Sequence, residues 1–70
     1  MKMRLEDAMV YALAAAGRGM TSEQLAETIN RDRLHVRADG KPVTGRQVYA
    51  AVCRNSTVFV KEGGRILLAM

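Results

Sequence analysis

The stretch VTGRQVYAAVCRNSTVFVKEGGRILLA, residues 43–69, changes its hydrophobic period from that of a helix to that of strands, and this change decides the fold. Its first part repeats apolar residues at helical spacing, directly after Thr44, whose hydroxyl can cap the first turn. Further on the period becomes two, and Gly63-Gly64 separates two β-rich segments, as in a two-residue hairpin. The stretch therefore predicts a helix over 45–55 followed by a hairpin over about 57–69.

The start of this helix has a counterpart earlier in the chain. VTGRQV at 43–48 and MTSEQL at 20–25 both read apolar, Thr, x, x, Gln, apolar. In such a capping box the Thr hydroxyl accepts a hydrogen bond from the first turn and the Gln side chain reaches back to the cap. The flanking apolar residues can pack on each other and fix how the chain enters the helix. The template predicts a second capped helix, over 22–34.

The segment before these two helices predicts a third helix, over 4–16. Its apolar residues recur at helical spacing from Leu5 to Leu13, and Gly17 is a suitable terminator. Between the two capped helices, HVRADGKPV at 35–43 has turn chemistry and is longer than the 3–4-residue turn of a helix-turn-helix. Residues 19–20 are expected to add a short strand at the edge of the hairpin.

The order helix, helix, helix, hairpin predicts an α+β domain, mostly α, of the winged helix-turn-helix kind: three helices followed by a C-terminal β-hairpin wing. We expect residues 1–70 to form one such domain. In domains of this kind the third helix enters the major groove of DNA and the wing contacts the backbone or the minor groove. The hairpin is expected to pack on the helices through Phe59, Ile66 and Leu68, which share one face.

The chain also resembles the HARE-HTH family along nearly its whole length. The resemblance is carried by LEDAMVYALAAAGRGMTSEQLAETINRDRL at 5–34, the DGxPV turn at 39–43, the capped helix, FV at 59–60 and GRILL at 64–68. It implies a winged helix-turn-helix of the kind found in bacterial proteins, in chromatin-associated eukaryotic proteins and at the N-terminus of the delta subunit of bacterial RNA polymerase. Most members are regarded as DNA-binding, whereas the delta-type domain contacts polymerase instead.

Composition and charge restrict the function classes. The 70 residues hold one histidine and one cysteine, which cannot form a structural metal site or a disulfide framework. Cys53 is expected to be partly buried and fits a reducing compartment. No apolar run approaches the ~20 residues of a membrane span. The net charge is +4, and residues 31–70 carry eight basic and three acidic side chains, which favours an anionic partner.

Basic residues at three places are the candidate DNA contacts. Arg46 lies near the start of the third helix, where an arginine can pair with guanine or phosphate, and Arg54 lies late in it, where phosphate contact is expected. Tyr49 can contact a sugar-phosphate or cover the edge of the core. The charges of the wing and the loop can bind phosphate, protect a sheet edge or simply be solvated. The candidate DNA-binding residues are Gly45, Arg46, Tyr49, Ala50, Arg54, Lys61, Arg65, Arg37 and Lys41.

Two hypotheses follow for function. The first is a small bacterial DNA-binding protein that acts in transcription regulation, cytoplasmic and associated with the nucleoid. The second is an adaptor that binds RNA polymerase or another transcription protein through the same fold. DNA binding requires the third helix, the wing and the 31–41 segment to share one positive face that Asp32, Asp39 or Glu62 does not split. Neither hypothesis involves catalysis, a cofactor, a metal or a membrane, and a homodimer is compatible with both.

Overall fold

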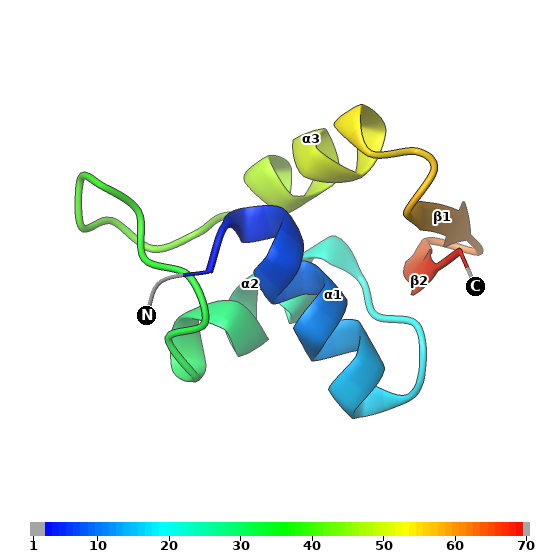
Figure 1. Ribbon diagram of the computed structural model, residues 1–70, viewed down its shortest axis with the longest axis horizontal. Coiled ribbons are helices and arrows are strands. Elements are labelled where there is room, and N and C mark those ends of the chain that lie inside the picture. Colours follow the sequence, from blue (N-terminus) through cyan, green and yellow to red (C-terminus); the bar gives the residue numbers. More distant parts are fainter. Residues whose placement is uncertain (1–2, 70) are drawn as a thin grey trace.

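The computed structural model describes residues 3–69 as three helices and an antiparallel hairpin (Figure 1). This small α+β domain confirms the predicted class and element order, and its arrangement is consistent with the layout of a winged helix. Figure 1 shows α3 crossing above α1 and α2, with the α2–α3 loop at one end of the molecule and the hairpin at the other. The elements are α1 (Leu5–Ala16), α2 (Ser22–Arg31), α3 (Gly45–Arg54), β1 (Phe59–Glu62) and β2 (Arg65–Leu68).

Both predicted capping boxes are present. At the start of α2 the Thr21 hydroxyl accepts from the Gln24 backbone N–H at 3.1 Å, and the Gln24 side chain accepts from the Thr21 N–H at 3.1 Å. At the start of α3, Thr44 and Gln47 form the same pair of bonds at 3.2 and 3.0 Å. Each box satisfies two backbone donors near the helix start, so both starts are fixed by nearby side chains.

The predicted end of α2 was wrong by three residues. The helix ends at Arg31 and not at residue 34, because Arg33 adopts a left-handed conformation with φ 52°. The Leu34 N–H then donates to the Ile29 carbonyl at 3.0 Å, and this bond closes the helix end. The apolar period continued to Leu34, which packs against the core from outside the helix.

The other boundaries differ by one or two residues. The first helix begins at residue 5 instead of 4, and α3 ends at Arg54, one residue before the predicted end. The strands span 59–62 and 65–68 and not the whole of 57–69, because residues 55–58 form a turn in which the Val58 N–H donates to the Asn55 carbonyl. Helix α1 ends as predicted, with Gly17 left-handed at φ 68°.

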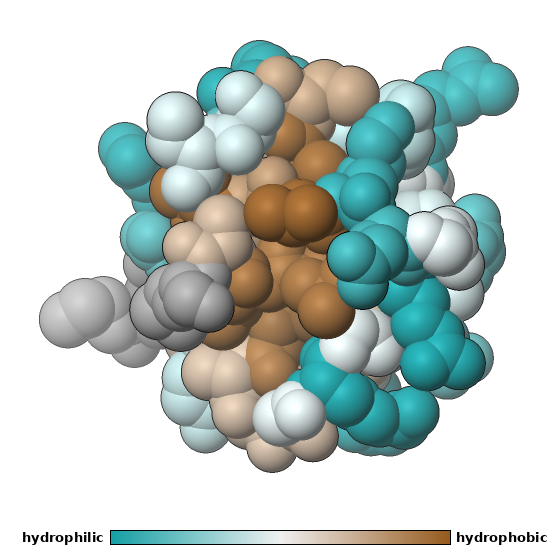
Figure 2. All heavy atoms as spheres, turned by 90° about the vertical axis from the view of Figure 1, so that its right-hand side faces the viewer, coloured by the Kyte–Doolittle hydropathy of each residue, from teal (hydrophilic) through white to brown (hydrophobic). Residues whose placement is uncertain are grey.

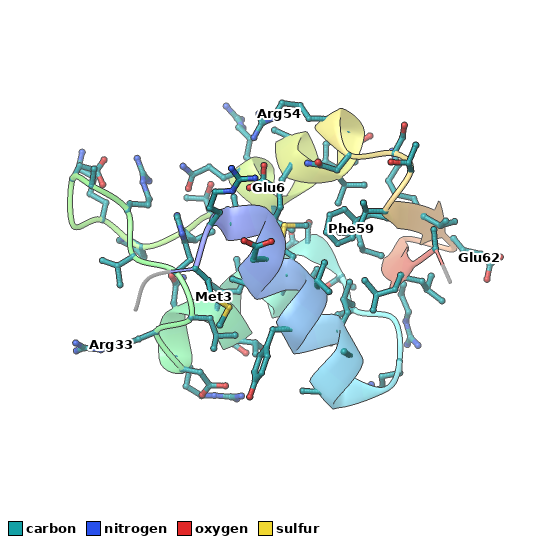
Figure 3. All side chains as sticks on the ribbon, viewed as in Figure 1. Met3, Glu6, Arg33, Arg54, Phe59 and Glu62 are labelled. Carbon is teal, nitrogen blue, oxygen red and sulfur yellow. The ribbon has the colours of Figure 1, made fainter. Side chains whose placement is uncertain are left out.

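The core lies where the three helices and one face of the hairpin meet. Its largest fully buried side chains are Met9 of α1, Leu25 and Ile29 of α2 and Val48 of α3. The hairpin contributes Phe59, which points from β1 toward the helices (Figure 3). Ile66 of β2 is buried and Leu68 is half-buried, as the period of two predicted. Together with the buried side chains of the three helices they form one apolar cluster.

The hairpin has the expected two-residue turn. Gly63 and Gly64 have φ values of 57° and 79°, which is the combination that a type I′ turn requires. Met20 pairs with Ile66 through backbone bonds of 3.1 and 2.7 Å, so the expected third strand is one isolated bridge. Gly19 comes directly before this bridge. A Cβ at that position would lie 3.0 Å from the Leu67 side chain, so only glycine fits there without a shift of its neighbours. Within residues 3–69 no helix has the length and apolar character to cross a membrane.

Candidate nucleic-acid interface

The position of α3 depends on one asparagine of α2. The Asn30 side chain donates to the Val43 carbonyl and accepts from the Val43 N–H, both at 2.9 Å. Val43 is buried, so these bonds satisfy backbone groups that water hardly reaches. The pair joins the end of α2 to the residue before the Thr44 cap, and it thereby fixes where α3 begins.

Arg37, a predicted phosphate contact of the loop, is engaged within the protein. Its guanidinium forms an ion pair with Asp39 at 2.7 Å, and the Arg37 side chain is 27% exposed. The same guanidinium donates to the Pro42 carbonyl and to the Gln47 side chain, both at 3.3 Å. These contacts tie the loop to the cap of α3. Because its charge is balanced by Asp39, Arg37 is a weaker candidate for phosphate than expected.

The outer surface of α3 carries two exposed arginines. Arg46 lies in the first turn and Arg54 at the last residue of the helix, where Figure 3 shows it on the side away from α1 and α2. Between them Ala50 is half-buried and Cys53 is exposed, so the expectation of a partly buried Cys53 was wrong. Tyr49 and Arg54 are about 140° apart around the helix axis, so they flank this surface on opposite sides.

Tyr49 joins α3 to the hairpin. The Lys61 ammonium donates to the Tyr49 hydroxyl at 2.6 Å and lies 4.2 Å from the centre of its ring. This hydrogen bond raises the pKa of Lys61 above its ordinary value. Ser22, the hairpin turn and these two side chains line an open groove of about 410 Å³. The wing lysine is thus placed beside α3, as the hypothesis of a shared face requires.

A carboxylate that the sequence did not single out lies at the start of α3. A Cβ on Gly45 would be 3.0 Å from Glu23 Oε2, so the Glu23 side chain packs directly on that glycine. The Ser22 hydroxyl donates to the same oxygen at 3.2 Å. A negative charge is favoured beside a helix N-terminus, which accounts for its position. No local signal could have revealed it, because Glu23 belongs to a different helix.

The positive surface is therefore continuous only in part. Within residues 3–69 the only ion pairs are Arg31–Asp32 and Arg37–Asp39. The loop that contains Lys41 lies at one end of the molecule, the hairpin lies at the other end, and α3 lies between them (Figure 1). Glu23 interrupts the surface at the start of α3, and Glu62 lies at the hairpin end (Figure 3). The candidate cations that form no ion pair with residues 3–69 are Lys41, Arg46, Arg54, Lys61 and Arg65.

The described residues include no group of three side chains that could hold a metal ion. His35 is half-buried, and its Nδ1 is 2.7 Å from the Met3 carbonyl oxygen. No family model, curated protein or solved structure matches this chain. The HARE-HTH resemblance therefore stays a prediction, and the case for function depends on the geometry above.

Proposed function

We propose that this domain binds double-stranded DNA and acts in transcription regulation in the bacterial cytoplasm, at the nucleoid. One observation carries the proposal: exposed cations without ion-pair partners in residues 3–69 extend along α3 and onto the loop and hairpin beside it. The capping box of α3 and the Asn30–Val43 pair fix the start of the helix, whose first turn carries the exposed Arg46. The function is one of binding, without catalysis or a cofactor.

In the proposed complex Arg46 reads base edges and the other cations contact phosphates. Arg46 is in the first turn of α3, the part of a recognition helix that contacts base edges. Arg54 and Lys41 are farther out and act as phosphate contacts. Arg65, also predicted as a DNA contact, is on the outer face of the hairpin, opposite the face that carries Lys61, so it is not counted among these contacts. If Arg54, Lys41 and Lys61 each neutralise one phosphate, log affinity falls with log salt at a slope of roughly −2.7.

Glu23 restricts what the start of α3 can contact. Its carboxylate repels a phosphate that approaches Gly45. A carboxylate at that place can instead accept a hydrogen bond from the exocyclic amino group of cytosine. Because Arg46 and Glu23 lie at one helix start, we expect higher affinity for DNA with a G·C pair at that place than for DNA of random sequence.

A salt titration with random duplex DNA tests the proposal, read by fluorescence anisotropy. Non-specific binding by such proteins typically has a dissociation constant of about 10⁻⁴ to 10⁻⁶ M. We expect binding in this range at 50 mM salt, and we expect the variant Arg46→Ala with Arg54→Ala to weaken it at least tenfold while the melting temperature stays nearly unchanged. The matched control is Arg4→Ala with Arg18→Ala, which removes the same charge from outside α3, the loop and the hairpin.

Two results would overturn DNA binding. One is the absence of binding at 50 mM salt up to about 100 μM protein. The other is an equal loss in the two double variants, because net charge alone would then explain the affinity. The adaptor hypothesis would gain in either case. It is favoured by Glu23 and Glu62, which bring negative charge to the α3–hairpin side, and its test is direct binding to purified bacterial RNA polymerase.

A further inference from the structure

The outer face of the hairpin carries apolar side chains that residues 3–69 cover only in part. In the register of the sheet, Val60 pairs with Leu67, and both side chains lie on the face opposite Phe59 and Ile66. Val58 continues the same face one pleat before β1. Its carbonyl accepts a hydrogen bond from the Ala69 N–H, which extends the strand pairing by one step. Val58 and Val60 are 40% and 43% exposed. Figure 2, which looks at this end of the molecule, shows apolar side chains gathered in its middle with polar ones beside them.

An apolar groove adjoins this valine ridge, formed by Val58 and Val60. It lies between the C-terminal end of α1 and β2, and its volume is about 400 Å³. Leu13 and Ala14 form its α1 side, Leu67 and Leu68 form its β2 side, and the segment 17–19, with the charged Arg18, completes it. Leu67 belongs to both the groove and the outer face of the hairpin. The two exposed valines and the groove therefore lie side by side on one surface, with Leu67 between them.

Charges of both signs border the same surface. Glu62 and Arg65 are opposite each other beside the turn, and their side chains share the outer face with Val60 and Leu67. Both are exposed, and they form no ion pair with each other or with any other of residues 3–69. An apolar centre with a polar rim is the usual arrangement of a protein–protein interface.

We propose that this surface binds a second copy of the chain about a two-fold axis. In a two-fold interface the same patch faces itself, so every feature must find its complement on the same surface. The valine ridge of one copy enters the groove of its partner, and the groove of the first copy receives the partner's ridge. Arg65 of one copy meets the partner's Glu62, and the reverse contact forms across the axis. A ridge beside a groove, and a cation beside an anion, are what such a self-complementary contact needs.

The size of the surface makes this dimer weak and reversible. The molecule measures 21 by 18 Å across the axis that ends at the hairpin, so one copy loses only a few hundred Å². A stable interface covers about 800 Å² on each partner. We therefore expect a dissociation constant of roughly 100 μM, in the range of weak and transient contacts. The dimer leaves α3 and the loop uncovered, so it forms without DNA and does not depend on the proposed function.

Sedimentation equilibrium of the full chain, from about 20 μM to 1 mM, tests the dimer. We expect monomer at the low end and mostly dimer at the high end. Val60→Glu should keep the protein monomeric throughout. The matched control is Val36→Glu, because Val36 is 46% exposed in the loop at the opposite end of the molecule, and this variant should associate like the wild type. Association of Val60→Glu equal to that of the wild type would overturn the proposal, as would an equal loss in the control.

A charge exchange tests the two-fold arrangement without changing the apolar surface. Glu62→Arg and Arg65→Glu should each weaken the dimer several-fold at low salt, and the double exchange should restore it. This set also decides the question if Val60→Glu does not fold. Failure of the double exchange to restore association, or a wild type that stays monomeric at 1 mM, would overturn the proposal and assign the surface to a different protein. Growth into species larger than a dimer would equally overturn it, because a two-fold contact closes on itself.

Discussion

The bond pair between Asn30 and Val43 offers the sharpest test of how the fold positions α3. Asn30→Ala removes both bonds of 2.9 Å and leaves the N–H and carbonyl of Val43 without their partner. Val43 is only 4% exposed, so water replaces that partner poorly. A net hydrogen bond contributes about 1 kcal/mol, and a buried backbone group left unpaired costs about 1–3 kcal/mol. We therefore expect a loss of about 3 kcal/mol in the free energy of unfolding.

This loss is large for a domain of 70 residues, whose total stability is roughly 4–10 kcal/mol. It corresponds to a fall in melting temperature of roughly 12–24 °C. The matched control is Asn55→Ala. Asn55 is also half-buried, but its side chain makes a single bond, to the Ala51 carbonyl at 2.8 Å within the last turn of α3. Its removal should cost about 1 kcal/mol.

A second substitution separates the two bonds. In Asn30→Asp one oxygen still accepts from the Val43 N–H, while the other faces the Val43 carbonyl and can bond to it only when protonated. This repulsion and the partial burial raise the pKa of the introduced carboxyl above its unfolded value near ~3.9. The stability that the protonated carboxyl contributes, through its bond to the Val43 carbonyl, is fully present below the unfolded pKa. It is lost as pH rises through the folded pKa. The deficit of this variant against the wild type should therefore be smaller at pH 4 than at pH 7.

Urea unfolding followed by circular dichroism at 222 nm measures all three variants. If Asn30→Ala costs less than about 1 kcal/mol, or no more than Asn55→Ala, the pair does not hold the loop as inferred. A deficit of Asn30→Asp that is the same at both pH values would show that the Val43 carbonyl does not face the second oxygen. A change in the denaturant slope instead of the midpoint would indicate that the folded state itself had loosened.

Four further outcomes are expected. Arg33→Gly should stabilise the fold by about 0.5–1 kcal/mol in urea unfolding, because φ is 52° there and glycine adopts that conformation without strain; a loss of stability would contradict this. Thr44→Ala should cost about 1 kcal/mol through the lost cap, and an unchanged urea midpoint would show that the cap contributes nothing. Glu23→Gln should strengthen binding to random duplex DNA about threefold at 50 mM salt, since it removes a negative charge beside Gly45, and an unchanged affinity would place the DNA elsewhere. Tyr49→Phe should lower the pKa of Lys61 toward its ordinary value in an NMR titration. Any stability from that bond is present below pH ~10.5 and lost as pH rises through the raised pKa, so an unchanged Lys61 titration would exclude the bond in solution.

Features that depend on neighbours in the chain were predicted correctly. Each cap joins a threonine to the glutamine three residues later, so MTSEQL and VTGRQV were enough to place the starts of α2 and α3. The Gly63-Gly64 turn likewise followed from two adjacent residues that accept positive φ. The end of α2 was missed for the opposite reason. Its apolar period runs on to Leu34, while a left-handed arginine, which has no reliable sequence signal, stops the helix first.

For the candidate site, the sequence indicated which residues are charged but not which charges remain free. Arg37 and Lys41 look alike in the sequence, yet Arg37 bonds to Asp39 and to Gln47 of α3, whereas Lys41 is exposed and forms no ion pair with residues 3–69. Lys61 was predicted as a wing contact to DNA, and the fold brings it onto Tyr49. Such pairings depend on the crossing of separate elements, which periodicity does not specify.

Local sequence was sufficient for the order of the elements, the starts of the capped helices, the hairpin turn and the apolar face of each segment, because these depend on contacts within a few residues. Three features follow from packing alone: Asn30 holds Val43, Glu23 lies at the start of α3, and the valines on the outer face of the hairpin stay exposed. The physical reason is that a side chain's free energy depends on the surface it meets after the elements pack. That surface comes from residues far away in the chain.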